Sequence, residues 1–598
     1  MQLHPLDVSI IIGYLLLTLA IGFWVSKKAS KNLDSYFLGS KELPWWILGV
    51  SNASGMFDIT GTMWLVSLCF VYGLKSVWIP WLWPVFNQIF LMIFLSTWVR
   101  RSNVLTGAEW ITTRFGDGKG ANLAYLSVVV FALVSTVGFL AYAFQGIGKF
   151  SALFLDWDLS PDTYALIFMG ITTLYVVKGG MFSVVLTECL QFMIMTVASI
   201  AIGVIAMVRV APDQLAAVIP NGWKEIFFGW QLDLDWTGIL DSVNARIADD
   251  GYGLFTAFFM MMVFKGYLIS AAGPAPNYDM QRILATKTPR EASLMSGFVS
   301  IVLFFPRYLM IGGLTVLALV FFSPELKTMG NDLDFELILP YAIKNFVPIG
   351  LMGVLLAGLL SAFMSTFAAT VNAAPAYIVN DIYKRYINPN ADRRKYVRMS
   401  YVCSIAVVVV GIGFGFIVQS IDDVTQWIVS ALWGGYTVAN VLKWYWWRLN
   451  GYGYFWGMVT GIVASLAAPI LFPEIKPALY VFPFILVISA IGTMIASYAT
   501  KPEDDEILIR FYKSVRPWGF WKPVIEKIRQ EDPTFEPNKN FKRDMFNVIV
   551  GIAWQTCLVA MPIYLIIKEN VAFATAFIIF AAMCWILKKN WYDKLEDA

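Results

Sequence analysis

Two adjacent hydroxyl side chains in an otherwise apolar stretch are the residues of this sequence best suited to holding an ion. Ser365 and Thr366 follow Ala362 by about one helical turn. On one helix, the two hydroxyls and the Ala362 carbonyl can present neutral oxygens to a hard cation such as Na⁺ when an unwound helix supplies further carbonyls. The same hydroxyls can instead bond to their own helix or join neighbouring helices, and on the pair alone this structural role is the favoured interpretation.

The rest of the composition excludes several classes of protein. Only 14% of the 598 residues are charged and 58% are hydrophobic, which rules out a soluble enzyme. The net charge of +3 is too small to imply a nucleic-acid partner. A single histidine, His4, and five scattered cysteines without a C-x-x-C spacing offer no metal cluster, and no nucleophile–base set stands out.

The elements that must carry these residues are membrane-spanning helices. A bilayer core needs about 20 mostly apolar residues per helix. The first segment is a retained helix rather than a signal peptide, because no basic region precedes it and no small-residue cleavage site follows it. Fifteen segments are predicted, over residues 7–26, 44–72, 77–99, 122–148, 162–177, 181–208, 252–276, 292–322, 347–376, 397–418, 423–442, 453–472, 478–497, 546–567 and 571–587.

Lysine and arginine gather in alternate loops between these segments. Because cytoplasmic loops carry the excess of positive residues, we predict a multi-pass protein of the cell membrane with its N-terminus outside and its C-terminus in the cytoplasm.

Two segments are interrupted by helix breakers. Residues 51–61 form a small, polar run, and Pro274 and Pro276 remove amide donors at the end of the seventh segment. Backbone that leaves the helix inside a membrane must line a polar cavity. Because the breaks lie five segments apart, segments 2–6 and 7–11 are predicted to be inverted repeats around a midplane site, with ordinary kinks as the alternative.

This organisation divides the chain into a core of two repeats and the helices and loops that precede, connect and follow them. The predicted parts are an N-terminal helix and loop (1–43), the first repeat (44–208), an extracellular loop (209–251), the second repeat (252–443), accessory helices (444–500), a cytoplasmic connector (501–545) and C-terminal accessory helices (546–598).

Several motifs, in order between residues 35 and 385, resemble those of the sodium:solute symporter family, which includes the sodium/glucose, sodium/proline and sodium/sialic acid cotransporters. Ala108 stands where the family usually has proline, and Glu188 stands where it has aspartate. The motifs are Ser35-Tyr36-Phe37-Leu38-Gly39, Thr106-Gly107-Ala108-Glu109-Trp110 with Arg114-Phe115-Gly116, Gly179-Gly180-Met181 with Thr187-Glu188-Cys189-Leu190-Gln191, Tyr278 with Gln281-Arg282, and Ser365-Thr366 with Asn372 and Asp381-Ile382-Tyr383-Lys384-Arg385.

The resemblance implies an all-α polytopic membrane protein with a five-plus-five inverted-repeat core and Na⁺ as the coupling ion. It also implies a sodium site near Glu188, whose carboxylate could balance the cation through water. The ligands of that site would be the carbonyls of Val50, Ala53 and Ala362 and the hydroxyls of Ser365 and Thr366.

Charged side chains inside the predicted spans are costly and usually functional. Asp58 and Thr60 lie in a sequence that resembles the Asp-Met-Ser-Gly of the proline branch, where the aspartate matters for sodium coupling. Asp58 is therefore predicted to couple ion and solute, with pairing to a buried cation such as Lys265 as the alternative. Arg307 can bind a solute carboxylate bidentately or be the structural partner of an acid such as Asp58, and the sequence favours neither role.

The solute pocket is predicted at the two breaks. Asn52, Ser54, Phe57, Asn277 and Tyr278 line it by position. Tyr278 can stack on the solute as an inner gate, as in relatives, or sit at the lipid interface. Phe57 stands where sugar-binding relatives have a glutamine, so their sugar site cannot be transferred directly.

The sequence therefore predicts a secondary active transporter, not an enzyme, that moves a sugar, polyol or organic acid into the cell with Na⁺. One alternative is a proton-coupled carrier on the same scaffold that uses Glu188 or Asp58. Another is a transporter-like membrane sensor, for which residues 501–545 are the one candidate signalling segment. The predicted partners are a small solute, sodium and the lipid bilayer, and the sequence specifies no oligomeric state.

Overall fold

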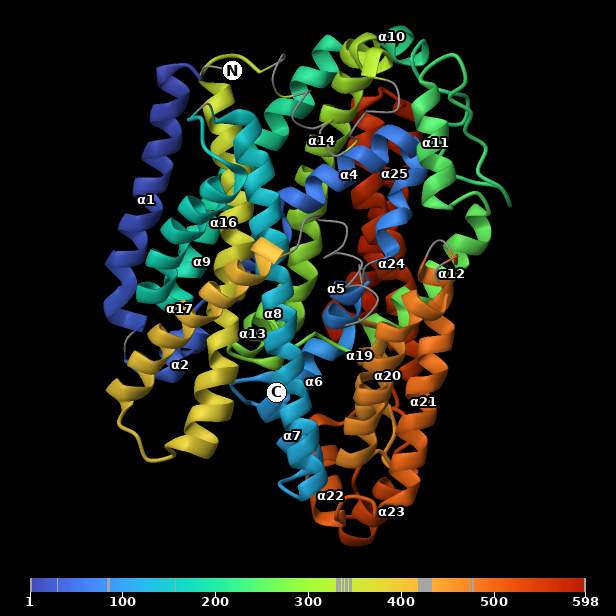
Figure 1. Cartoon of the computed structure of the whole chain (residues 1–598). Helices are drawn as coiled ribbons and strands as arrows, with labels where there is room; N and C mark the ends of the chain where they lie inside the picture. The colour runs from blue at the N-terminus through green and yellow to red at the C-terminus, as the bar shows by residue number, and fades with distance from the viewer. Residues whose placement is uncertain are drawn as a thin grey trace.

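The computed structural model is all-helical, and most of its long helices run roughly parallel along one axis (Figure 1). It describes residues 3–29, 31–82, 86–155, 157–329, 335, 338, 343, 347–417, 433–472, 474–475 and 478–595. From the N-terminus the helices are α1 (Pro5–Ala29), α2 (Leu33–Leu38), η1 (Gly39–Lys41), α3 (Trp45–Met56), α4 (Ile59–Tyr72), η2 (Gly73–Val77), η3 (Ile79–Leu82), α5 (Asn87–Phe90), η4 (Leu91–Leu95), α6 (Ser96–Arg101), α7 (Gly107–Phe115), α8 (Lys119–Phe154) and α9 (Pro161–Arg209). They continue with α10 (Pro212–Ala216), α11 (Asp241–Asp250), α12 (Phe255–Ala271), α13 (Tyr278–Leu284), α14 (Pro289–Met329), α16 (Leu351–Ile378), η7 (Val379–Ile387), α17 (Arg393–Ile417), α19 (Trp433–Tyr445), α20 (Gly451–Leu471), η9 (Ala478–Val481), α21 (Phe482–Ala499), α22 (Asp505–Val515), α23 (Lys522–Glu531), α24 (Phe541–Ile566), α25 (Asn570–Asn590) and η10 (Tyr592–Lys594).

The number of candidate membrane spans is lower than the sequence predicts. Within the described residues, ten helices are long and apolar enough to cross a membrane, or up to eleven if the bent pair α11 and α12 forms one span. The predicted count of fifteen is therefore not confirmed. Part of the difference arises because predicted segment 77–99 consists of short helical pieces, and because much of segment 423–442 lies outside the described residues.

Helix α9 accounts for another part of that difference. It extends from Pro161 to Arg209 as two helical stretches that meet at a kink, where the sequence predicts two segments. Gly180 interrupts it with φ 50° and ψ −148°, values that a residue with a Cβ rarely adopts. The break falls in the gap between the two predicted segments, 162–177 and 181–208. Both segments are therefore present, and they are counted together as one candidate span.

Both predicted helix breaks are present. The first separates α3 from α4 at Phe57 and Asp58, where the Asp58 carboxylate accepts the Gly61 amide at 2.7 Å as an N-cap. The second separates α12 from α13, and Asn277 caps α13 by accepting the Asp279 amide at 3.0 Å. The two breaks lie together, because the Tyr278 hydroxyl donates to the Gly55 carbonyl at 3.3 Å.

The first helix is anchored to the core by a buried carboxylate. Helix α1 packs beside α9 and α16 (Figure 1). At its start, Asp7 accepts the backbone amides of Gly350 and Gly353 at 2.8 and 2.7 Å. A negative side chain at the N-terminus of a helix is stabilising, so Asp7 holds the end of α16 in place.

Two tryptophans attach the segment before α12 to the core. Trp223 and Trp236 are fully buried and donate to the carbonyls of Phe70 and Val71 at 3.0 and 3.2 Å. These carbonyls belong to the last turn of α4, where the helix leaves them without partners of its own. Helices α10 and α11 of this segment lie at the opposite end of the molecule from α22 and α23 (Figure 1).

Arg114, which belongs to one of the recognised motifs, joins α7 to the accessory helices. Its side chain is fully buried and donates to main-chain carbonyls at the C-terminal end of α19 and just beyond it. The acceptors are Lys443 at 3.0 Å, Trp446 at 3.1 Å, Trp447 at 3.3 Å and Leu449 at 3.1 Å. The arginine therefore supplies the cation and the donors that a helix C-terminus favours.

Candidate functional site

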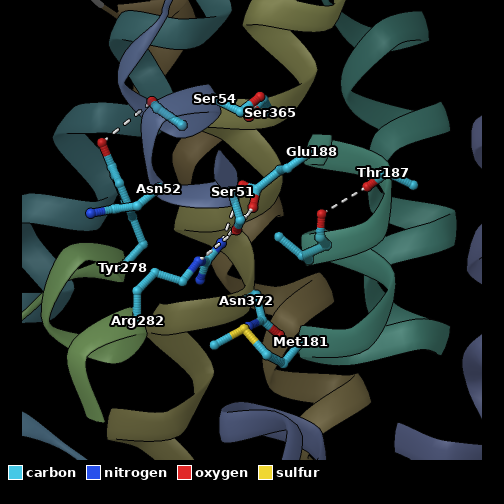
Figure 2. A network of polar contacts seen from close by, with 12 residues as sticks. Ser51, Asn52, Ser54, Met181, Thr187, Glu188, Tyr278, Arg282, Ser365 and Asn372 are labelled. Carbon is cyan, nitrogen blue, oxygen red and sulfur yellow. Dashed lines mark hydrogen bonds and ion pairs between the residues drawn. The ribbon is translucent and has the colours of Figure 1, made fainter. Parts of the chain in front are cut away.

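The hydroxyls of Ser365 and Thr366 on α16 lie against the last turn of α3. Ser365 Oγ donates to Ser54 Oγ at 2.8 Å, and the two side chains meet in Figure 2. Thr366 Oγ1 donates to the Gly55 carbonyl at 2.7 Å and lies 3.2 Å from the Ala362 carbonyl. Neutral oxygens from two helices therefore converge here, which is the ligand type that a hard cation prefers.

The family resemblance implies the carbonyls of Val50 and Ala53 as sodium ligands, but the residues of α3 that bond to Ser365 and Thr366 lie further along the helix. Both residues lie inside α3, which stays helical as far as Met56. The Ala53 carbonyl accepts the Phe57 amide at 3.1 Å, while the side chains of Ser365 and Thr366 reach Ser54 and Gly55. Helix α3 ends at Met56, inside the polar run 51–61, and the oxygens that meet Ser365 and Thr366 come from Ser54 and Gly55, after Ala53.

Glu188 on α9 lies in a fully buried ion pair. Arg282 Nη2 is 2.9 Å from Glu188 Oε2, and both side chains are 0% exposed. The Ser51 hydroxyl donates to the same carboxylate and accepts from Arg282 Nε at 3.0 Å (Figure 2). The charge of Glu188 is thus balanced by a guanidinium group of the protein.

The same network continues through the other motif residues. Arg282 Nη1 donates to Gln281 Oε1 at 3.2 Å, and Asn372 Nδ2 donates to the same oxygen at 3.3 Å. Gln281 Nε2 in turn donates to the Phe37 carbonyl at 2.8 Å. Motifs that are far apart in the sequence therefore meet in one buried polar network, a partnership that the sequence analysis did not identify.

Asp58 and Arg307 form the second ion pair of the site. Arg307 Nη2 is 3.1 Å from Asp58 Oδ1, with side-chain exposures of 11% and 20%. Asp58 Oδ2 also accepts from the Tyr142 hydroxyl at 2.9 Å, and Arg307 Nη1 donates to the Met56 carbonyl at 3.0 Å. Of the two roles considered for Arg307, the structure shows the partner of Asp58.

Lys265 and Thr60 are not part of the Asp58–Arg307 ion pair. The Lys265 ammonium is 5.8 Å from the centre of the Phe482 ring. Asp58 does pair with a cation, as the alternative role held, but that cation is Arg307 and not Lys265. Thr60 is buried against Gly146 of α8, where its hydroxyl occupies the space that a Cβ would need. Thr60 thus fixes the start of α4 against α8.

The predicted pocket residues separate into groups. Asn277 and Tyr278 line a small cavity at the second break, together with Ser135, Thr136, Phe139, Pro276, Thr370, Ala373, Ala374 and Tyr377. Phe57 is buried, with its ring 5.5 Å from the Arg307 guanidinium. Ser54 belongs to the contact with Ser365, and Asn52 points to the other side of α3 (Figure 2).

Asp279 is a buried acid that the sequence analysis missed. Its side chain is 5% exposed and accepts from Asn52 Nδ2 at 2.7 Å. The available signal was a carboxylate next to Tyr278, within the first turn after a membrane helix break. Ser51 and Tyr142, the partners of Glu188 and Asp58, were also missed because they are ordinary polar residues of apolar helices.

Two broken helices that face each other within a bundle of apolar spans define a polytopic membrane transporter. The model of the sodium:solute symporter family matches residues 36–461, and the chain belongs to this family. It is thus a multi-pass membrane protein and a sodium-coupled symporter of small polar solutes, not an enzyme.

Individual relatives agree with this assignment. The chain is 23% identical to sodium/glucose cotransporter 4 of Danio rerio, over 90% of this chain and 84% of that protein. It is 24% identical to a sodium/mannose cotransporter of Bos taurus, over 78% and 79%. It is 25% identical to human sodium/myo-inositol cotransporter 2, over 78% and 70%.

A solved structure shows the same fold. The substrate-bound, outward-open state of a Na⁺-coupled sialic acid symporter aligns with a TM-score of 0.65 at 18% identity, covering 84% of this chain and 99% of that chain. The expected five-plus-five inverted-repeat core is therefore confirmed as the fold class.

Proposed function

We propose that this symporter carries a neutral, hydroxyl-rich solute, a sugar or a polyol, into the cell together with Na⁺. The observation that carries the proposal is the wall of the cavity at the second break, where Asn277, Tyr278 and Tyr377 lie with three hydroxyl side chains of α8 and α16. Such groups exchange hydrogen bonds with solute hydroxyls. Relatives named for glucose, mannose and myo-inositol support the same solute class.

The engagement of Arg307 argues against an organic acid. Both terminal nitrogens of its guanidinium already have acceptors, in Asp58 and the Met56 carbonyl. A solute carboxylate would have to displace Asp58 and leave that acid without its cation, which is unfavourable in a largely buried site.

The sodium site in this proposal is the contact between α3 and α16. Its members are the hydroxyls of Ser365 and Thr366 with the carbonyls of Ala362 and Gly55. Thr366 Oγ1 lies within hydrogen-bond distance of both carbonyls, and Ser365 Oγ contacts the neighbouring Ser54 hydroxyl of α3. The carbonyls of Val50 and Ala53 would join this set if α3 unwound further. Glu188, with its charge balanced by Arg282, would hold α3 through Ser51 rather than bind the ion.

Sodium bound here would tie the broken helix α3 to α16 and stabilise one arrangement of the bundle. Asp58 and Thr60 would transmit that change, since Asp58 contacts Tyr142 and Arg307 on two other helices. Coupling of this kind is reciprocal, so solute must raise the affinity for sodium by the same factor. Each ion moving down a potential of 100 mV contributes about 2.3 kcal/mol to accumulation.

The membrane orientation belongs to the same proposal. The N-terminus and the loop 209–251 would face the outside, and the connector 501–545 and the C-terminus would face the cytoplasm. The placement of α10 and α11 at the opposite end from α22 and α23 supports this assignment (Figure 1).

Uptake into proteoliposomes tests the function directly. Labelled hexoses, polyols, sialic acid, proline and short carboxylates are supplied with an inward sodium gradient or a matched proton gradient. We expect uptake of a hexose or polyol that requires sodium, and at least about a tenfold higher half-saturating sodium concentration in Ser365→Ala/Thr366→Ala, because lost contacts to a charged group are costly.

The matched control is Ser400→Ala/Ser404→Ala. These two hydroxyls are also buried on one helix, but they donate to the Tyr396 and Ser400 carbonyls of that same helix. The control should transport like the unmodified protein. Uptake driven only by protons, or uptake of carboxylates alone, would contradict the proposal.

A further inference from the structure

Asp279 is a buried carboxylate held only by neutral side chains. Asn52 Nδ2 and Gln88 Nε2 donate to its Oδ1 at 2.7 and 3.2 Å, and Asn87 Nδ2 donates to its Oδ2 at 3.2 Å. Among the described residues, none forms an ion pair with it. Arg282, three positions further along, is engaged by Glu188 and Ser51. An uncompensated carboxylate at this depth is expensive, so its charge calls for a positive ligand.

The three side-chain amides around Asp279 also have buried oxygens without hydrogen-bond partners among the described residues. The buried oxygens Asn52 Oδ1, Asn87 Oδ1 and Gln88 Oε1 have no hydrogen-bond partner within the described part of the chain. Asn52 is 0% exposed and Gln88 is 5% exposed, so their oxygens are also shielded from solvent. Native proteins pair most such groups, so these three amide oxygens provide unused acceptor capacity around one carboxylate, which a bound ion can use.

Rotation of the three side-chain amide groups can turn these oxygens toward the Asp279 carboxylate. The terminal torsion of Asn and Gln is soft and roughly two-fold, so a half turn exchanges the NH₂ group with the carbonyl oxygen. After such a turn, each amide presents an oxygen where it now presents a donor. Asp279 with Asn52, Asn87 and Gln88 then offers up to five oxygens to one ion.

We propose that Asp279, Asn52, Asn87 and Gln88 form a second cation site that takes Na⁺. Hard oxygen ligands select a hard cation, and a single carboxylate balances one unit of charge, whereas divalent sites usually gather several carboxylates. On α3, Asn52 points away from Glu188 and from the Ser54–Ser365 contact (Figure 2), and it bonds to the Asp279 carboxylate that Asn87 and Gln88 also contact.

An ion at the Asp279 site would connect different helices from an ion at the Ser365–Thr366 site. Asn52 belongs to α3, Asn87 and Gln88 begin α5, and Asp279 lies in the first turn of α13. An ion here would bind the broken helix of the second repeat to that of the first, while the Ser365–Thr366 site binds α3 to α16. The inference rests on the proposed sodium coupling for its role in transport, but binding of the ion can be measured without any solute.

Equilibrium binding of radioactive sodium to the purified full-length protein tests the site. We expect Asp279→Asn, which keeps the size of the side chain, to lower saturating binding about twofold, because one of two single-charge sites is lost. Ser365→Ala/Thr366→Ala should lower it by a similar factor, and the combined variant should bind no sodium. Asp544→Asn, which removes a buried carboxylate from α24, is the control and should bind like the unmodified protein.

The outcomes separate this site from the first one. Unchanged saturation in Asp279→Asn would overturn the second site while leaving the Ser365–Thr366 site intact. Loss of solute binding with unchanged sodium binding would also overturn it and assign Asp279 to the solute. Sodium binding that depends on Asp279 but not on Ser365 and Thr366 would support the second site and contradict the first.

A gain of function provides an independent check that does not rely on removing Asp279. Asn87 is only partly buried, so Asn87→Asp can be accommodated and adds a second carboxylate to the cluster. The added charge should let Ca²⁺ displace radioactive sodium at a concentration more than about tenfold lower than in the unmodified protein. Unchanged competition by Ca²⁺ would overturn the assignment of these side chains to one ion site.

Discussion

Arg282 and Glu188 are joined by an ion pair that is entirely removed from solvent, with Nη2 2.9 Å from Oε2 and both side chains 0% exposed. The pair connects α13, which follows the second helix break, to α9 in the first repeat. Ser51 of α3 completes it by bonding to both partners. This ion pair and Ser51 therefore connect α13 of the second broken helix to α3 of the first, next to the proposed sodium site.

Removing one member of this pair should be far worse than removing both. Arg282→Met or Glu188→Gln alone leaves a buried group without its partner, so each should lower the free energy of unfolding by about 3–5 kcal/mol. The double variant should recover most of that loss. Thermal unfolding in detergent measures the three variants side by side. Additive losses in the double variant would show that the two residues act independently.

The Asp58–Arg307 pair should carry coupling rather than stability alone. Asp58→Asn keeps an oxygen for the Gly61 amide but deprives Arg307 of its counter-charge, so we expect sodium-driven uptake to fall about tenfold. Tyr142→Phe, which removes one hydrogen bond to the same carboxylate, should cost only about 1 kcal/mol of stability and retain uptake. Sodium-dependent uptake by Asp58→Asn at the unmodified rate would exclude a coupling role.

Gly180 is required by the break inside α9. Its φ is 50°, and a Cβ there would lie 2.7 Å from the Tyr36 carbonyl oxygen. Gly180→Ala should therefore destabilise the protein by about 1–3 kcal/mol. Gly170→Ala in the same helix meets no atom within 4 Å and should instead be neutral or stabilising by up to about 1 kcal/mol. Melting temperatures of the two variants decide, and equal shifts would argue against strain at Gly180.

We expect the stability of the protein to depend on pH through Glu503, which lies between α21 and α22. Burial raises the pKa of the Glu503 carboxyl above its ordinary 4.5, although the carboxyl accepts the Gly451 amide at 2.8 Å. The unfolded chain therefore loses this proton at lower pH than the folded protein does. Stability should fall as the pH rises from 4.5 through the raised pKa, because the folded state binds more protons in that window.

The comparison with Glu503→Gln isolates that effect. The variant should lack the step, so its melting temperature should rise relative to the unmodified protein as the pH increases above 4.5. A constant difference between the two proteins across this range would show that Glu503 does not titrate differently on folding.

The sequence by itself determined the features that depend on neighbouring residues. Long apolar runs set the class of protein, since lipid accepts only helices whose backbone is internally bonded. The polar run before Asp58 and the two prolines before Asn277 mark the helix breaks, because these residues interrupt helices locally. Ser365 and Thr366 stood out as a hydroxyl pair, and the family motifs gave the fold.

Only the tertiary structure decided which of these residues meet. Arg307 rather than Lys265 pairs with Asp58, Arg282 pairs with Glu188, and Asp279 gathers amides from two other helices. Thr366 donates to the Gly55 carbonyl, two residues beyond Ala53 in the last turn of α3. Such pairings join residues that are 94 to 311 positions apart, and they depend on the rotation and the register of each helix against its neighbours. A uniformly apolar helix carries almost no sequence signal for that rotation, because every face of it is compatible with lipid or with another helix.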